Sequence, residues 1–234
     1  MIVTIDGPAG SGKSTTAREV ARRLGFRHLD SGAFYRAITL AALRAAIPLE
    51  QWPDLGTRQL DGFRVSARPA DHGFEMWLDD EPVGEAIRAE DVNAGVSRMA
   101  RVPAVREWLY RRLRDMAALG SLVTDGRDMG TVVFPEADLK IFLTADLETR
   151  ARRRLGERGA TDPDPPLLHA EMDRMAARDR RDSERLVAPL RKADDAVVID
   201  TSGLDFESQV ARIVALIRGR AAPGPAPVDG TFDG

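Results

Sequence analysis

A glycine-rich segment directly after the first predicted strand constrains this chain more than any other feature. Residues 7–14, Gly-Pro-Ala-Gly-Ser-Gly-Lys-Ser, fit the pattern G-x-x-x-x-G-K-[ST] in full. A β-branched run at 2–5 precedes the segment, and apolar residues at helical spacing predict a helix over 13–24. Glycines let successive backbone amides face phosphate oxygens, and a helix N-terminus favours anions. A chance glycine-rich turn would not need this strand–loop–helix context.

The segment therefore predicts a site for the phosphates of ATP. It is formed by Gly7, Pro8, Ala9, Gly10, Ser11, Gly12, Lys13, Ser14 and Thr15. Lys13 is expected to reach the β- and γ-phosphates and to act in catalysis, and the Ser14 hydroxyl can bind Mg²⁺. The motif alone leaves a kinase, a GTPase switch and a motor ATPase open.

The distribution of predicted elements indicates an α/β fold. Short apolar strands alternate with helices, which is typical of a parallel sheet flanked by helices; the strands are expected at 2–5, 26–29, 121–124, 139–143 and 196–199. Alternating segments at 63–67 and 74–78 instead predict a small antiparallel meander. We predict one domain over 1–220, with a core at 1–61 and 119–220, an insertion at about 62–118, a lid at about 150–166 and a disordered Pro/Gly-rich tail at 221–234.

Composition narrows the class of protein. The chain of 234 residues has a net charge of −3 and no cysteine, which excludes disulfides, zinc–thiolate sites and cysteine nucleophiles. No apolar run reaches the roughly 20 residues of a membrane span, and no signal peptide is evident. We expect a cytoplasmic monomer that does not bind membranes. We also expect that it does not bind nucleic acid, because proteins that coat nucleic acid are usually basic.

Two segments predict a second anion site. Ser31, a candidate helix cap, and Arg36, about one turn later, can together hold a phosphate other than those of ATP. Asp125-Gly126-Arg127-Asp128 follows a predicted core strand, where ligands of parallel sheets bind. Arg127 can bind a phosphate through two hydrogen bonds, Asp128 can accept from an exocyclic amine, and Asp125 can lie near the metal. Simple helix capping and a turn closed by its own Asp–Arg pair remain the alternatives.

Two charged helical segments are ambiguous. Arg178, Asp182 and Arg185 have the spacing i, i+4, i+7, which places them on one face of a helix predicted for 167–185. The helix predicted for 147–158 carries five arginines within nine residues, which repel one another unless a polyphosphate binds. Both segments can equally be solvated helix faces. Asp200-Thr201-Ser202, after the last strand, is a candidate loop on the adenine side.

Several of these segments together resemble bacterial cytidylate kinases. The similar residues are Ile5 to Lys13, Leu29-Asp-Ser-Gly-Ala-Phe-Tyr-Arg36, Gly84 to Arg88, Val105-Arg106, Asp125 to Pro135, Arg178 to Asp182 and Val187 to Leu190, and the resemblance extends over about 2–218. It implies a nucleoside-monophosphate kinase core with an enlarged insertion for the monophosphate. It also implies transfer of the γ-phosphate of ATP to CMP or dCMP with Mg²⁺, in pyrimidine metabolism.

The resemblance also implies roles for individual residues. Ser31, Arg36 and Arg127 would hold the CMP phosphate, with Arg127 also catalytic, and Ser97, Arg106, Asp128 and Arg185 would surround the cytosine. Arg178 and Asp182 would contact the sugar and phosphate region. Arg150 and Arg153 would act from the lid on the transferring phosphates. Some members have glycine at the position of Ser14, so its role as a metal ligand rests on the general motif.

Two other functions stay open at this point. The chain can be a kinase of another small acceptor, such as AMP, UMP or shikimate. It can also be a regulator or nucleic-acid-associated ATPase whose basic lid helix binds RNA or DNA, although the acidic net charge of −3 disfavours this.

Overall fold

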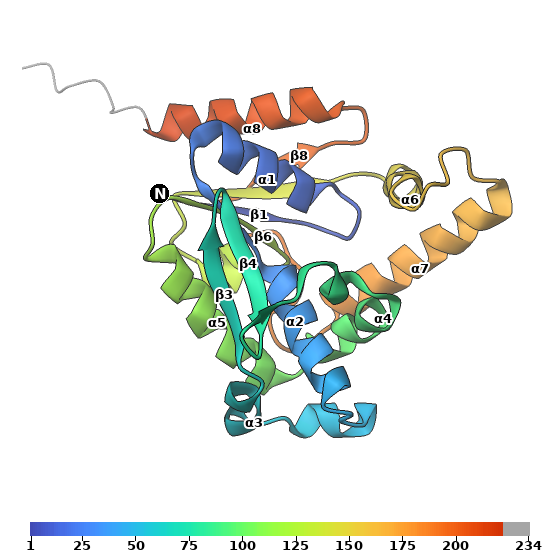
Figure 1. Cartoon of the computed structure of the whole chain (residues 1–234). Coiled ribbons are helices and arrows are strands. Elements are labelled where there is room, and N and C mark those ends of the chain that lie inside the picture. Colours follow the sequence, from blue (N-terminus) through green and yellow to red (C-terminus); the bar gives the residue numbers. More distant parts are fainter. Residues whose placement is uncertain (222–234) are drawn as a thin grey trace, which may run out of the picture.

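A five-stranded parallel sheet forms the centre of the computed structural model, which describes residues 1–221 (Figure 1). Its strands are β1 (Ile2–Asp6), β2 (Arg27–Asp30), β6 (Leu122–Gly126), β7 (Leu139–Thr144) and β8 (Val197–Asp200). They lie in the order β2-β6-β1-β7-β8, and each neighbouring pair is parallel. This confirms the predicted parallel α/β fold. The carboxyl ends of β1, β2 and β6 are neighbours, so the loops that follow them converge on one edge.

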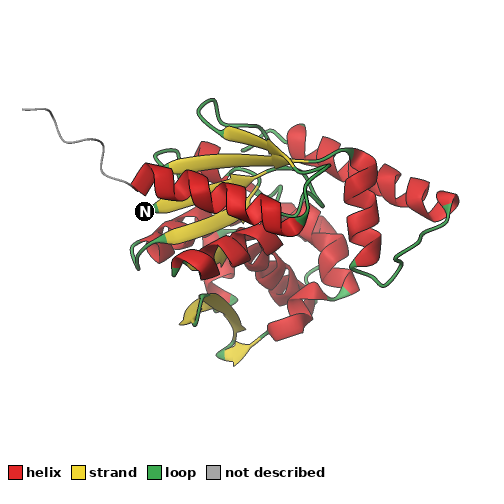
Figure 2. Ribbon diagram, turned by 90° about the horizontal axis from the view of Figure 1, so that it is seen from above, coloured by secondary structure: helices red, strands yellow, loops and turns green. Residues whose placement is uncertain are grey.

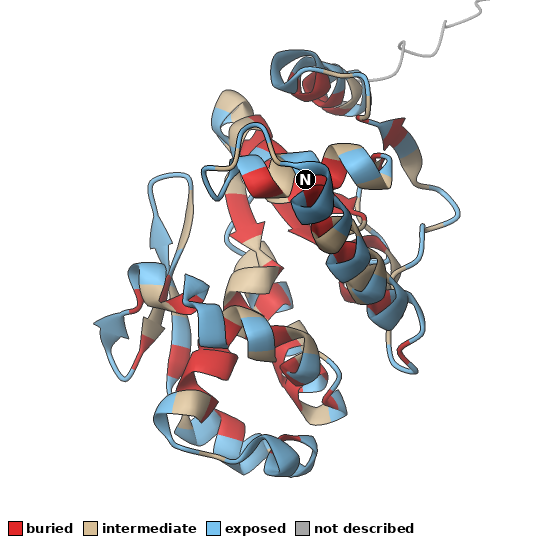
Figure 3. Cartoon of the chain, turned by 90° about the vertical axis from the view of Figure 1, so that its right-hand side faces the viewer, coloured by how far each residue is buried: buried red, intermediate tan, exposed pale blue. Residues whose placement is uncertain are grey.

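Helices cover both faces of the sheet, as Figure 2 shows from above. On one face, α1 (Lys13–Leu24) and α8 (Phe206–Ala221) bury apolar side chains against Val3 and Ile5 of β1. On the other, α2 (Ser31–Arg44) and α5 (Pro103–Ala117) pack around Leu29 and Leu122. Buried residues concentrate in the strands and on the helix sides that face them (Figure 3). Strands buried on both faces need apolar sequences, which is why short β-branched and leucine-rich runs predicted these strands.

An insertion between α2 and β6 carries the second, antiparallel sheet. Its strands are β3 (Val65–Ala70), β4 (Gly73–Leu78) and β5 (Glu81–Pro82), in that order, which confirms the predicted meander. Its helices are α3 (Thr57–Gly62), α4 (Glu90–Met99) and the 3₁₀ turns η1 (Leu49–Asp54) and η2 (Gly84–Arg88), which precede α5. Trp52, Met76, Leu78 and Val96 are buried in one cluster with α2, so the insertion packs directly on the core.

Two helices follow β7 and project beyond the sheet, at the right of Figure 1: α6 (Leu147–Gly156) and α7 (Pro165–Ser183). The Asp164 carboxylate accepts a hydrogen bond from the Leu167 amide at 2.8 Å, and Pro165 follows as the first helical residue. Aspartate caps and prolines suit a helix N-terminus, so α7 starts earlier than predicted. It also ends at Ser183. Arg185 therefore lies beyond the helix, and the predicted shared face with Arg178 and Asp182 is wrong for Arg185.

The remaining differences are local. Asp30, rather than Ser31, caps α2, because its carboxylate accepts from the Ala33 amide at 3.0 Å. A short π-helical turn, η3 (Met129–Val133), follows β6. The predicted tail lies outside the described residues, apart from Ala221, at which α8 ends. No helix within residues 1–221 has the length and apolarity to cross a membrane.

Candidate functional site

The glycine-rich loop, residues 7–14, connects β1 to α1 at the edge where the strand ends converge. Gly7, Gly10 and Gly12 have φ angles of 151°, 73° and 83°, a region that side chains disfavour. A Cβ on Gly7 would stand 2.0 Å from the carbonyl oxygen of Leu143 in β7, so the loop passes directly against that strand. These glycines are therefore required by the backbone path.

Lys13 is buried at the first position of α1. Its ammonium donates to the Pro8 carbonyl at 2.5 Å and to the Ser11 hydroxyl at 3.2 Å, within its own loop. Burial lowers the pKa of Lys13 well below its usual value, and the positive charges of Arg127 and Arg178 lower it further. A bound polyphosphate would stabilise the charged form, because an opposite charge nearby raises the pKa of an ammonium group.

Arg150 of α6 and Asp179 of α7 contact the glycine-rich loop. Asp179 of α7 accepts from the Ala9 amide at 3.1 Å, and Arg150 of α6 donates to the Ala9 carbonyl at 2.9 Å and to Asp179 at 2.5 Å. Arg150 is buried, and it also donates to the Ala145 carbonyl at 3.0 Å. The resemblance implied that Arg150 would act on the transferring phosphates, and that role stays a prediction. In this structure its guanidinium binds the backbone of the glycine-rich loop.

Arg153, the other predicted lid residue, faces the loop after β8. It donates to the Thr201 hydroxyl at 2.9 Å and to the Thr201 carbonyl at 2.6 Å. Asp200 and Ser202 close the same loop, with the Ser202 hydroxyl 2.7 Å from the Asp200 carboxylate. The predicted adenine-side loop is thus tied to α6, and Arg153 would have to leave Thr201 to reach a phosphate.

Oxygen donors suited to a metal stand at the start of α1. The Ser14 hydroxyl donates to Asp125 Oδ2 at 2.5 Å, and the His28 imidazole lies 2.8 Å from Asp125 Oδ1. No three acidic, histidine or cysteine side chains among residues 1–221 gather as a metal cage. Mg²⁺ typically takes one or two protein oxygens and completes its shell with phosphates and water. Ser14 and Asp125 fit that pattern.

Asp6, at the end of β1, fixes the turn that follows β6. Its two carboxylate oxygens accept from the amides of Met129 at 2.9 Å and Gly130 at 2.7 Å. Burial raises the pKa of Asp6 to about 6, although these hydrogen bonds counteract the rise. This contact, which the sequence did not suggest, holds Asp125 to Asp128 in place relative to the glycine-rich loop.

Three arginines form a second positive region beside Lys13. Arg127 donates to Asp182 at 3.0 Å, whereas the buried Nε atoms of Arg36 and Arg178 have no hydrogen-bond partner among the described residues. Burial lowers the pKa of Arg178 to about 10, and the charges of Arg127 and Arg36 contribute to the shift. Burial likewise lowers the pKa of Arg36. A cation with a buried donor atom that makes no hydrogen bond is costly unless an anion pairs with it, so this region is suited to a phosphate.

Ser31 lies at the same edge of the sheet as the three arginines, but its hydroxyl is already engaged within the protein. Its hydroxyl donates to the Asp125 carbonyl at 2.7 Å, which joins α2 to β6. The same oxygen still has lone pairs with which to accept a hydrogen bond.

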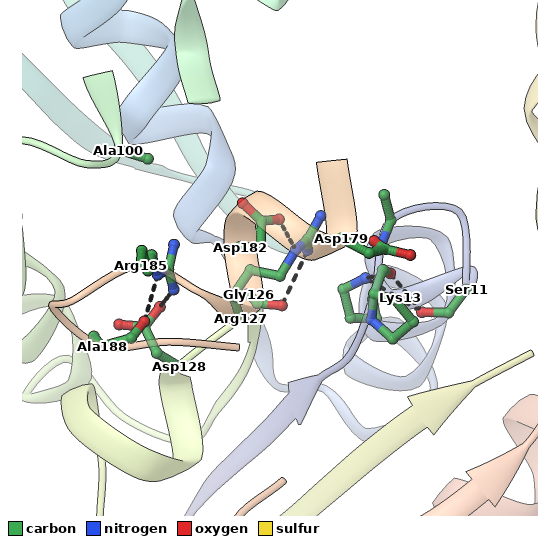
Figure 4. Close-up of polar contacts among 12 residues, drawn as sticks. Ser11, Lys13, Ala100, Gly126, Arg127, Asp128, Asp179, Asp182, Arg185 and Ala188 are labelled. Carbon is green, nitrogen blue, oxygen red and sulfur yellow. Dashed lines mark hydrogen bonds and ion pairs between the residues drawn. The ribbon is translucent and has the colours of Figure 1, made fainter. Parts of the chain in front are cut away.

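Asp128 is the centre of a buried ionic cluster, shown in Figure 4 beside Arg127 and Lys13. Its Oδ2 accepts from Arg106 at 2.5 Å and from the Tyr110 hydroxyl at 2.7 Å, and its Oδ1 accepts from Arg185 at 3.3 Å. Arg106 also donates to Tyr110 at 2.8 Å. Oδ1 has the weaker set of partners and is the atom best able to take a further donor, such as an amine.

The resemblance implied that Arg106, Asp128 and Arg185 share one pocket, and the structure brings the three side chains together. Tyr110, Asp179 and His28 were not predicted. Tyr110 stands one helical turn after Arg106 on α5, which was the one available signal. Ser97, half-buried on α4, takes no part in the side-chain hydrogen bonds that join the other residues of the site. Its predicted contact with a base stays a prediction.

The chain is similar to known kinases over nearly its whole length. The sequence profile of the cytidylate kinase family matches residues 3–219. The cytidylate kinase of Exiguobacterium sibiricum is 44% identical over 93% of this chain and 96% of its own. Those of Pseudomonas paraeruginosa and Carboxydothermus hydrogenoformans are 46% and 43% identical over 91% and 93% of this chain, and 93% and 97% of their own. The crystal structure of TT1252 from Thermus thermophilus shares the fold, with a TM-score of 0.50 at 17% identity over 95% of this chain and 98% of that one. The chain therefore belongs to the cytidylate kinase family.

Proposed function

We propose that this protein transfers the γ-phosphate of ATP to CMP and dCMP, forming ADP with CDP or dCDP. One observation carries the proposal: two groups of cations lie side by side, Lys13 in the glycine-rich loop and, next to it, Arg36 and Arg178, whose Nε atoms have no hydrogen-bond partner among the described residues. A phosphate donor and a phosphate-bearing acceptor need such a pair. The relatives named cytidylate kinase support cytosine as the base.

The reaction would be an in-line displacement at the γ-phosphorus. An oxygen of the CMP phosphate attacks, and the bond to the β–γ bridging oxygen breaks, so that ADP leaves. The attacking oxygen is already anionic at neutral pH, so no side chain has to remove a proton. Catalysis would then depend on positioning and charge stabilisation, which we assign to Lys13 and Arg127.

Ser14 and Asp125 would hold the Mg²⁺ that accompanies ATP, with Asp125 acting directly or through water. A bound Mg²⁺ neutralises charge on the β- and γ-phosphates. Ser31, Arg36, Arg127 and Arg178 would hold the acceptor phosphate, and Asp182 keeps Arg127 oriented. Arg106, Asp128 and Arg185 would read the base, and Oδ1 of Asp128 would accept from the cytosine amine.

Arg150 and Arg153 are proposed to act at the phosphates only after lid movement exchanges their present partners. Until then, Arg150 supports the glycine-rich loop through Ala9, and Arg153 supports the loop after β8 through Thr201. Closure of such a lid would also exclude water, which competes with CMP as acceptor.

We further propose that the protein works as a monomer in the cytoplasm, without binding nucleic acid. All residues assigned to the two anion sites and the base pocket come from one chain, so the proposed site needs no residue from a second copy. Light scattering coupled to size-exclusion chromatography would test the monomer, since a stable dimer at assay concentration contradicts it.

Parallel turnover assays would test the central proposal. ADP formation is followed with ATP, Mg²⁺ and each of CMP, dCMP, UMP, AMP and shikimate in turn. We expect CMP and dCMP to be preferred over UMP, because uracil presents a carbonyl where Asp128 needs a donor. An unmatched buried pair costs about 1–3 kcal/mol, or roughly 5- to 150-fold in kcat/KM. Equal use of UMP, or a better rate with AMP or shikimate, would refute the assignment of the acceptor.

A further inference from the structure

His28 occupies a junction between the core sheet and the insertion. It lies in β2, the edge strand of the parallel sheet, and it is buried. Its side chain and its main chain contact different parts of the protein. The imidazole Nε2 lies 2.8 Å from Asp125 Oδ1, and the backbone amide donates to the His72 carbonyl at 2.8 Å.

The side-chain contact fixes the orientation of Asp125. A carboxylate oxygen only accepts hydrogen bonds, so Nε2 of His28 is the donor in this contact, and the Ser14 hydroxyl donates to Oδ2 at 2.5 Å. His28 takes one oxygen and Ser14 the other, so neither oxygen can rotate away without breaking a bond.

The main-chain contact anchors the tip of the β3–β4 hairpin, whose upper end reaches the central sheet in Figure 1. A Cβ on Gly73 would stand 2.9 Å from the His28 carbonyl oxygen, so only glycine allows this approach. The hairpin belongs to the insertion that packs on α2. The insertion thus contacts the sheet at the residue that orients Asp125.

We propose that His28 is a positioning residue: it holds Asp125 in the orientation that Mg²⁺–ATP requires, and it links this carboxylate to the hairpin of the insertion. The proposal rests on Ser14 and Asp125 forming the metal site of the proposed function. It does not depend on which acceptor the protein uses.

The first test measures nucleotide binding without an acceptor. Calorimetric titration with a non-hydrolysable ATP analogue, with Mg²⁺ and with EDTA, gives the gain in affinity due to the metal for each variant. Partners that orient metal ligands are typically worth about 10- to 100-fold in metal affinity. We expect His28→Leu, which removes the donor, to reduce the Mg²⁺-dependent gain by about tenfold or more and to leave binding in EDTA unchanged.

His28→Gln is the rescue variant. The amide nitrogen of glutamine stands as many bonds from Cα as Nε2 of histidine, so it can donate to Asp125. We expect it to restore most of the Mg²⁺-dependent gain. A His28→Leu protein with the wild-type gain, or a Gln variant no better than Leu, overturns the proposal. A loss of equal size in EDTA would also overturn it, because it would indicate general damage to the site.

The link to the hairpin has its own matched pair. Gly73→Ala forces the tip away from His28, whereas His72→Ala removes an exposed side chain and keeps the carbonyl that accepts from His28. We expect Gly73→Ala to reduce the Mg²⁺-dependent gain and His72→Ala to leave it unchanged. No effect of Gly73→Ala refutes the link. Turnover of the wild type with CMP is measured separately, so a failed function and a failed role of His28 are distinguished.

Discussion

Removal of the Tyr110 hydroxyl is a sharp test of the base pocket. This hydroxyl donates to Asp128 Oδ2 at 2.7 Å and accepts from Arg106 Nε at 2.8 Å, between two buried and oppositely charged groups. Tyr110→Phe leaves both groups with one partner fewer. Arg106 keeps its bonds to Asp128 and to the Ala100 carbonyl, at 2.5 and 2.8 Å, so the pair itself survives.

The size of the effect follows from the charge of the partners. Hydrogen bonds to charged groups contribute about 1.5–3 kcal/mol each, and the surviving bonds limit the total loss to about 2–3 kcal/mol. For a chain of this length, that corresponds to a fall in Tm of about 4–12 °C. The carboxylate of Asp128 is also less firmly held, so we expect KM for CMP to rise about three- to tenfold, or about 0.6–1.4 kcal/mol. We expect kcat to change little, since the transferred phosphate is bound elsewhere.

Tyr35→Phe provides the matched control. The Tyr35 hydroxyl is also buried, but it has no hydrogen-bond partner among the described residues. Its removal should leave the Tm unchanged or raise it, because an unsatisfied buried hydroxyl destabilises the folded state. Calorimetry gives the two Tm values, and initial rates against CMP and UMP give kcat and KM. If both variants have the same Tm, or if Tyr110→Phe keeps the KM of the wild type, the assigned role of Tyr110 is wrong.

Three further perturbations test other parts of the site. Lys13→Ala should lower kcat with CMP by roughly 10²- to 10³-fold, since Lys13 meets charge that shifts in the transition state; near-normal turnover in the assay of ADP formation would refute its role. Gly7→Ala should destabilise the fold by more than about 3 kcal/mol in urea unfolding, because its Cβ would stand 2.0 Å from the Leu143 carbonyl oxygen; an unchanged midpoint would contradict this. Burial raises the pKa of Asp6 to about 6, so its carboxyl binds a proton more readily in the folded than in the unfolded protein. The free energy of unfolding should therefore fall as the pH rises from about 4 to about 6, and then level off. Asp6→Asn should remove that fall from urea unfolding measured across the range, and an unaltered slope would exclude Asp6 as its source.

The features that the sequence predicted well are those with local signals. The glycine-rich loop, the strands and the meander are each specified by neighbouring residues, so pattern and turn chemistry were enough. Arg106, Asp128 and Arg185 were brought together only through the resemblance to a family, because they come from α5, the end of β6 and the loop after α7. Nothing in their spacing indicates that they meet.

The contacts that the sequence did not predict also have physical reasons. A cluster of arginines indicates that anions or carbonyls must be near, but it does not say which; Arg150 is satisfied by Ala9 and Asp179, and Arg153 by Thr201. The helical spacing that placed Arg185 with Arg178 assumed a helix that continues, whereas α7 stops at Ser183. Partners such as His28 for Asp125 depend on strand pairing between distant segments, which periodicity cannot reveal.

The hydrogen bonds of Arg150 and Asp179 to Ala9 have a consequence for how this sequence can diverge. Asp179 accepts from both Arg150 and the Ala9 amide, so loss of Asp179 would leave the buried Arg150 without its carboxylate and the loop amide without its acceptor. Loss of Arg150 would leave Asp179 without its cation and the Ala9 carbonyl without its donor. The two positions, which lie 29 residues apart in the chain on α6 and α7, should therefore change together or not at all. A natural variant that lost one of them would have to rebuild the support of its phosphate-binding loop from another part of the protein.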